Sequence, residues 1–160
     1  MKVLVLGYGN RSRNDDGVGW FVVEQLGTML LADVELQTAH KLEVDHADAI
    51  RRFDTVIFVD AAVPQSSHLV TRTVVSPRLQ GHAVAHYLTP ADVLALCSSL
   101  YGIQPHATLF SVRGEDFNFG TTLSPATERA AQEVVRQVAC LVNQMRQPEP
   151  GVAGSQVAHA

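Results

Sequence analysis

The chain has 160 residues, of which 46% are hydrophobic and 18% charged, and its formal net charge at pH 7 is −4. A chain of this size suits one globular domain with a substantial core, and its composition excludes a disordered or fibrous protein. The negative balance offers no basic field for nucleic acid or an anionic membrane surface, and no apolar run approaches the roughly 18 residues of a membrane-spanning helix. We therefore expect a small molecule, a metal ion or another protein as the partner, with no nucleic acid and no membrane.

The two cysteines, Cys97 and Cys140, lie in apolar stretches with helical periodicity, and neither belongs to a Cys-x-x-Cys pair. This placement favours reduced core thiols over a disulfide or a zinc site. The first apolar run stops at Gly7 with no small-residue cleavage site after it, so a secretory signal peptide is not expected. We expect a soluble, cytoplasmic protein.

The first 60 residues alternate between strand and helix patterns. The first run, from Lys2 to Leu6, is too uniformly apolar for a strand with one solvent-exposed face, so it predicts a central parallel strand covered on both sides. Apolar residues then recur at four-residue spacing, which predicts a helix that Asn14 or Asp15 can cap. Repeated strand and helix at this spacing predict right-handed crossovers and the α/β class. In chain order we expect strands at 2–6, 34–38 and 55–59 and helices at 17–31 and 45–52.

The second half continues the alternation and then loses it. Polar residues interrupt the fourth strand, which suggests a sheet edge. Thr89 and Asp92 form a capping box around a proline, and Gly102 stops the helix that follows. We expect strands at 68–76 and 108–112 and helices at 90–101 and from 125. No linker divides the chain, so we predict a single domain over 1–147 and a disordered, Pro/Gly/Ser/Ala-rich tail over 148–160.

Acidic residues follow two of the expected strands. Asp15 and Asp16 come after the first strand, Asp60 comes directly after the third, and His86 lies in the loop before the helix at 90–101. In open α/β sheets, ligands bind beyond the carboxyl ends of the strands, where the winding direction reverses. Two carboxylates and one imidazole would suit a divalent transition metal at an open site. One cap is enough for the helix, so we assign Asp15 to capping and Asp16 to the metal.

Each of these residues also has a purely structural interpretation. Asp15 and Asp16 could both serve the positive end of the first helix. Asp60 could simply start a turn after a buried strand, and His86 could be a surface histidine. Taken one at a time, these residues do not identify a site.

A dinucleotide fingerprint is the rival interpretation of Gly7-x-Gly9. Ser12 stands where the third glycine belongs, and the two following acids would face the pyrophosphate that such a helix end attracts. The glycines instead favour a sharp turn that leaves a groove for a guest chain or a cation.

Several segments share a specific combined spacing. They are Val3-Leu4-Val5-Leu6-Gly7-x-Gly9-Asn10, then Asp15-Asp16-Gly17-x-Gly19, then Asp54-x-Val56-Ile57-Phe58-Val59-Asp60-Ala61, then His86 six residues before Asp92-Val93-Leu94, and finally Leu123-Ser124-Pro125. Together they resemble the hydrogenase maturation endopeptidases, from Met1 to about Val142. The resemblance implies a three-layer α/β fold, with a mostly parallel, twisted sheet of about five strands and helices on both faces.

The resemblance also implies a function, which is removal of the C-terminal extension from the precursor of a [NiFe]-hydrogenase large subunit after nickel insertion. By position, the family's metal ligands fall on Asp16, Asp60 and His86, and its catalytic acids on Asp16 and Asp60, as in an aspartyl protease. The family's frequent Asp-Gly-Gly-Thr stretch is replaced here by Thr38-Ala39-His40-Lys41-Leu42. This resembles a subgroup that serves cytosolic, cofactor-linked hydrogenases, and it makes His40 a candidate substrate contact beside Gly9 and Asn10.

We further expect nickel to arrive bound to precursor cysteines rather than to be held permanently, because two acids and one histidine leave ligand positions open. Either a carboxylate activates water or the metal polarises the carbonyl. The loops at 77–86 and 114–120 are candidates for precursor contact. Two rivals stay open: a metallopeptidase with its own zinc, which lacks a His-Glu-x-x-His helix, and a nickel-binding chaperone or docking module without hydrolytic activity.

Overall fold

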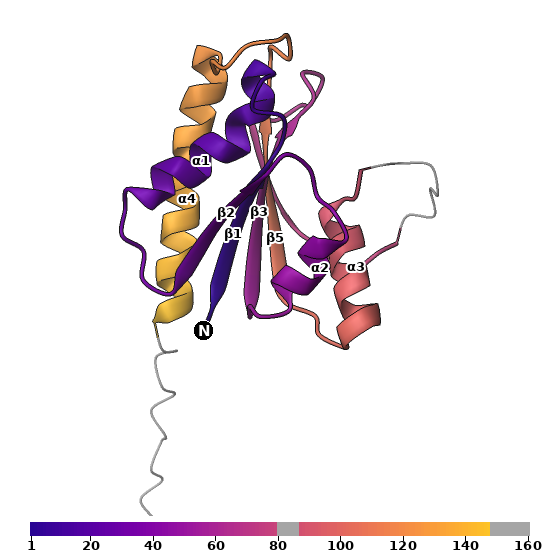
Figure 1. The fold of residues 1–160 in the computed structure, drawn as a ribbon. Coiled ribbons are helices and arrows are strands. Elements are labelled where there is room, and N and C mark those ends of the chain that lie inside the picture. The colour runs from indigo at the N-terminus through magenta and orange to yellow at the C-terminus, as the bar shows by residue number, and fades with distance from the viewer. Residues whose placement is uncertain (80–86, 148–160) are drawn as a thin grey trace, which may run out of the picture.

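The computed structural model describes residues 1–79 and 87–147. His86, most of the candidate contact loop 77–86 and the predicted tail 148–160 lie outside the described residues. Five strands form one sheet in the order β2-β1-β3-β5-β4 (Figure 1). They are β1 (Val3–Tyr8), β2 (Val34–Ala39), β3 (Thr55–Ala62), β4 (Val70–Val74) and β5 (His106–Arg113).

Four strands are parallel, and β4 alone runs antiparallel, paired with β5 at the sheet edge. Every residue of β1 is buried, as expected of a strand with a neighbour on each side and a helix layer on each face. Val74 at the end of β4 is 79% exposed, which agrees with the edge position predicted from the polar residues of that segment.

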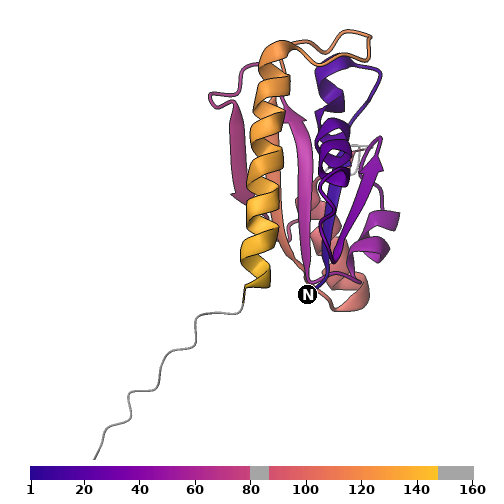
Figure 2. The ribbon, with the colours of Figure 1, turned by 90° about the vertical axis from the view of Figure 1, so that its left-hand side faces the viewer.

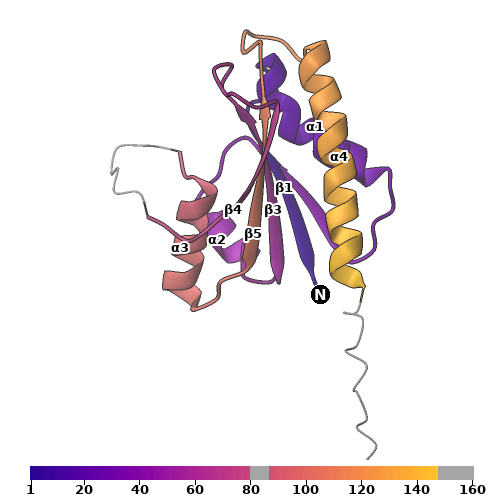
Figure 3. The same ribbon diagram turned by 180° about the vertical axis from the view of Figure 1, so that it is seen from behind.

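Helices cover both faces of the sheet. The segment η1 (Asn14–Gly17) is a 3₁₀ turn, and it is followed by α1 (Val18–Gly27), α2 (Asp45–Ile50), α3 (Pro90–Tyr101) and α4 (Pro125–Arg146). Figures 2 and 3 show α1 and α4 on one face and α2 and α3 on the other. Each helix pair closes a separate apolar core against the sheet, so the predicted three-layer α/β fold is confirmed. None of the described helices has the length and apolarity needed to cross a membrane.

Gly7 and Gly19 let α1 lie directly on the sheet. A Cβ at Gly7 would come 2.1 Å from the carbonyl oxygen of Gly19, and a Cβ at Gly19 would come 2.6 Å from the carbonyl oxygen of Val59. Gly7 and Gly9 were expected to form a sharp turn. Gly7 instead lies inside β1, where it allows the helix to pack closely on the strand, and Gly9 alone of these two makes the turn.

Several boundaries differ from those predicted. The first helix begins one residue late, behind the 3₁₀ turn, and ends at Gly27 rather than at residue 31. Leu30, expected on its buried stripe, is 93% exposed with φ 48°. The third strand extends through Ala62, so Asp60 lies within the ladder, paired with Ser111, rather than after it. The capping box at Thr89 and the left-handed Gly102 that ends α3 are as predicted.

The winding direction reverses between β1 and β3. From β1 the chain passes through α1 to β2 on one side, and then through α2 to β3 on the other side of β1. The carboxyl ends of β1 and β3 therefore flank the topological switch point, which is where open α/β sheets bind ligands.

Candidate functional site

A cavity of about 600 Å³ lies at this switch point. It opens on the face of α2 and α3, between the carboxyl ends of the strands and the start of α3. The lining contains Asp16, Asp60, Gly9, Asn10 and His40, which are all the described residues that the sequence analysis placed in the site. The other lining residues are Tyr8, Arg13, Lys41, Leu42, Tyr87, Leu88, Thr89, Pro90 and Leu109.

Asp16 is held by the turn after β1. Its carboxylate Oδ2 accepts a hydrogen bond from the backbone N–H of Asn10 at 2.6 Å. Gly9 has φ 144°, and a Cβ there would come 2.1 Å from the Asp16 carbonyl oxygen. The indole Nε1–H of Trp20 donates to the Gly9 carbonyl at 3.0 Å, which ties the same turn to α1. Gly9 and Asn10 thus place Asp16 as well as lining the cavity.

Asp60 enters the cavity from the middle strand. Strand alternation puts it on the same face as Phe58 and Tyr8, and the rings of those two residues meet edge to face at 6.5 Å. Burial raises the pKa of Asp60 to about 7, and the negative charge of Asp16 adds to the rise, although hydrogen bonds from the Ala61 N–H and the Tyr8 hydroxyl oppose it. The same burial and the Asp60 charge raise the pKa of the Tyr8 hydroxyl above its ordinary value. Asp16 and Asp60 are therefore close enough to repel one another.

Asp15 does not cap the helix that follows it. No side chain caps η1 or α1, and the fully buried Asp15 carboxylate instead accepts four hydrogen bonds from across the molecule. The backbone N–H groups of Glu115 and Asp116 donate to it at 2.8 and 2.9 Å, and Ser124 donates through its N–H at 2.7 Å and its hydroxyl at 2.8 Å. Burial raises the pKa of Asp15, but these hydrogen bonds together outweigh burial and lower it. The assignment of Asp15 to capping α1 was wrong, because its donors come from the loop after β5 and the start of α4.

The turn after β1 and the loop after β5 form one hydrogen-bonded unit. The backbone N–H groups of Asn14 and Gly120 each donate a hydrogen bond to the facing segment, at 2.8 and 2.9 Å. Arg13 and Gly120 also form an isolated β-bridge. The Asn14 side chain adds contacts to Asp116 and Thr122. Figure 2 shows this loop beside the turn at the carboxyl end of the sheet. The candidate contact loop 114–120 is thus fixed against the segment that carries Asp16.

The described residues supply part of a metal site. Nowhere in 1–79 or 87–147 do three His, Cys, Asp or Glu side chains gather closely enough to hold a metal ion. Asp16 and Asp60 fit a divalent cation, because a bound cation would favour the charged form of Asp60, whose pKa is raised by burial and further by the charge of Asp16. Further ligands would have to come from elsewhere. His86, the third predicted ligand, lies outside the described residues.

Sequence reasoning missed several residues of the cavity, including Tyr8, Arg13 and Lys41. Tyr8 could have been found, because it is two residues beyond Leu6 in a strand whose alternate side chains share one face. Arg13 and Lys41 carry no local signal, since only the docking of two loops brings them to the cavity.

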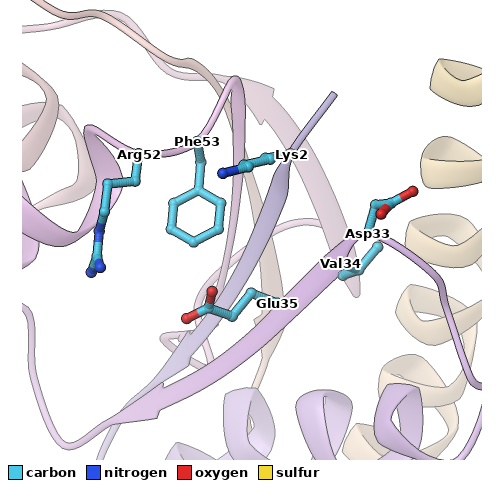
Figure 4. Close-up of a pocket in the computed structure, with 6 residues that line it drawn as sticks. All are labelled: Lys2, Asp33, Val34, Glu35, Arg52 and Phe53. Carbon is cyan, nitrogen blue, oxygen red and sulfur yellow. The ribbon is translucent and has the colours of Figure 1, made fainter.

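A second hollow of about 470 Å³ lies at the opposite, amino end of the strands (Figure 4). Its lining mixes two basic and two acidic residues with Val34 and the ring of Phe53; the charged residues are Lys2, Arg52, Asp33 and Glu35. Asp33 already pairs with Arg146 at 3.2 Å. Because ligands of such sheets bind at the carboxyl ends, the cavity that holds Asp16 and Asp60 is the candidate active site.

No protein-family model and no curated protein sequence matches this chain. Solved structures do match. The hydrogenase maturating endopeptidase HybD from Escherichia coli aligns with a TM-score of 0.71 and 23% identity, over 91% of this chain and 94% of that one. The fold is that of the hydrogenase maturation proteases. The maturation protease HycI from Thermococcus kodakarensis gives 0.70 and 21%, over 89% and 92%, and an endopeptidase from Escherichia coli gives 0.72 and 25%, over 91% and 94%.

These alignments run through most of both chains, so the likeness concerns the domain as a whole rather than one motif. They confirm the family resemblance drawn from the sequence at the level of the fold.

Proposed function

We propose that the protein is an endopeptidase that removes the C-terminal extension from the precursor of a [NiFe]-hydrogenase large subunit after nickel has been inserted. One observation carries the proposal. Asp16 and Asp60 meet in a cavity at the switch point, in a fold shared with hydrogenase maturation proteases. Two carboxylates that line one cavity suit both general acid–base chemistry and contact with a metal ion.

Nickel belongs to the substrate in this proposal. Asp16 and Asp60 bind the nickel that precursor thiolates already hold, and His86 completes the set of protein ligands. Support comes from the chemistry of the proposed donor set, because two carboxylates and one imidazole leave ligand positions open for the thiolates of the precursor. Docking on the substrate's nickel then brings the scissile peptide to the carboxylates.

Hydrolysis needs one proton acceptor and one proton donor. A carboxylate in the cavity takes a proton from water as the water oxygen bonds to the peptide carbonyl carbon. The carbon–nitrogen bond then breaks, and the proton passes to the departing amine. Tyr8 and the Ala61 N–H hold the Asp60 carboxyl for this exchange, as the Asn10 N–H holds Asp16.

We place this activity in the cytoplasm, which suits two cysteines that are both free thiols. Cys97 is buried as expected, whereas Cys140, also expected in the core, is exposed on α4. His40, exposed at the edge of the cavity after β2, contacts the entering peptide together with Gly9 and Asn10.

The test is cleavage of a purified large-subunit precursor, with and without nickel, followed by mass spectrometry. The nickel-loaded precursor should lose its extension and the nickel-free form should not; equal cleavage of the two would remove nickel from the proposal. Asp16→Asn and Asp60→Asn should abolish cleavage, whereas Asp45→Asn, the same change at an exposed residue outside the cavity, should not.

Two further outcomes would favour the rivals. Nickel-precursor binding by the wild-type protein without any cleavage would indicate the chaperone or docking module. Stoichiometric zinc in the purified, active protein would indicate a metallopeptidase with its own metal.

A further inference from the structure

Arg13 stands at the mouth of the cavity and has no acidic partner among the described residues. It lines the cavity, it is exposed, and none of the ion pairs formed within residues 1–79 and 87–147 involves it. To the residues that the structure describes, its guanidinium makes one long hydrogen bond, from Nη1 to the Phe117 carbonyl at 3.4 Å. A guanidinium has five N–H donors, so most of the hydrogen-bonding capacity of Arg13 is left for a ligand.

Phe119 supports this guanidinium. The Arg13 Cζ lies 4.4 Å from the centre of the Phe119 ring, although that ring is 81% exposed. An aromatic side chain this exposed contributes little to the core, but it can hold a guanidinium over its face and leave the N–H edge open. The hydrogen bonds between Asn14, Gly120 and the facing loops fix the two residues relative to the cavity. Arg13 is therefore pre-positioned, which lowers the entropy cost of binding.

The charges of the cavity define where an anion could bind. Asp16 and Asp60 would repel an anion at the centre, whereas Arg13 and Lys41 add positive charge to the lining. Lys41 contacts Glu43 only loosely, at 3.7 Å. A carboxylate matches the planar fork of a guanidinium better than a single carbonyl oxygen does.

We propose that Arg13, held over Phe119, is a specificity-determining residue that binds an acidic side chain of the precursor segment entering the cavity. This inference rests on the proposed function, because it takes the precursor as the substrate.

The test compares Arg13→Gln with Arg11→Gln in steady-state processing of the nickel-loaded precursor. Arg11 lies two residues away, but it pairs with Glu24, stacks on Trp20 and does not line the cavity, so it controls for the loss of one positive charge. Arg13→Gln should raise KM roughly tenfold, the effect of losing one charge-assisted pair, and leave kcat within about twofold. Arg11→Gln should leave both unchanged.

Salt and the precursor itself give two independent readouts. The KM of the wild type should rise with ionic strength, and that of Arg13→Gln should rise less. Acidic residues of the precursor near the cut are replaced one at a time by their amides. One such replacement should raise the KM of the wild type and have no further effect on Arg13→Gln. Phe119→Ala should give a smaller rise in KM, because the guanidinium stays but is no longer held.

Unchanged KM and salt dependence in a folded Arg13→Gln protein would overturn the inference, as would the absence of any coupled acidic residue in the precursor. If the wild type processes no precursor, the proposed function fails by itself. The affinity for the precursor, measured by titration of the Trp20 fluorescence, then decides the inference. Arg13→Gln must bind the precursor roughly tenfold more weakly than Arg11→Gln, and equal binding would overturn the inference.

Discussion

The buried carboxylate of Asp15 is the most informative place to perturb the fold. Asp15→Asn keeps the shape of the side chain but replaces one acceptor oxygen by an NH₂ donor. If the amide oxygen takes the place of Oδ2, it keeps the donors Glu115 N–H, Asp116 N–H and Ser124 Oγ–H. The amide nitrogen then faces the Ser124 N–H, which loses its acceptor at 2.7 Å.

The cost follows from these contacts. An unsatisfied buried N–H costs about 1–3 kcal/mol, and the three remaining hydrogen bonds weaken because they no longer reach a charge. We expect Asp15→Asn to lower the free energy of unfolding by about 3 kcal/mol at pH 7, which corresponds to a fall in Tm of roughly 6–12 °C. Urea unfolding followed by the fluorescence of the single tryptophan, Trp20, measures this loss of stability. As a control, Asp45→Asn should change the free energy of unfolding by less than about 0.5 kcal/mol.

The pH dependence of stability tests the same role of Asp15. The folded-state pKa of Asp15 is lowered, so its contribution to stability is complete above the unfolded pKa and is lost as pH falls through the folded pKa. The stability difference between wild type and Asp15→Asn should therefore shrink below about pH 4. A difference under about 1 kcal/mol at pH 7, or one that grows on acidification, would refute the role assigned to this carboxylate.

Three further substitutions separate the site from its scaffold. Gly9→Ala puts a Cβ 2.1 Å from the Asp16 carbonyl oxygen, at a residue with φ 144°. Precursor processing should fall at least tenfold, and the free energy of unfolding should fall by about 1–3 kcal/mol. Unchanged processing would contradict the placement of Asp16. Gly19→Ala presses a Cβ against the backbone of β3 and β1 and should cost about 1–3 kcal/mol by urea titration, and an unchanged midpoint would contradict close packing. Thr89→Ala removes the capping box of α3 and should cost about 1 kcal/mol, most of which Thr89→Ser should restore; equal loss in both variants would point away from the cap.

Local sequence patterns predicted the elements well, because their signals lie within a few residues. The apolar run at β1, the β-branched run at β3, the capping box at Thr89 and the left-handed Gly102 each depend on neighbours in the chain. Boundaries failed where packing overrode periodicity. Leu30 matched the apolar spacing of α1, but the helix had already ended at Gly27.

The sequence by itself indicated the fold class and five of the residues that line the candidate cavity. Asp16 and Asp60 were expected near one another because the carboxyl ends of parallel strands lie along one edge of the sheet, and Gly9 and Asn10 precede Asp16 in the same turn. Tertiary structure alone decided the role of Asp15, whose donors are 100 to 109 residues away, and the placement of Arg13 over Phe119. The physical reason is that helix and strand patterns record which face of an element is buried. They do not record which distant loop will supply the hydrogen bonds that a buried carboxylate requires.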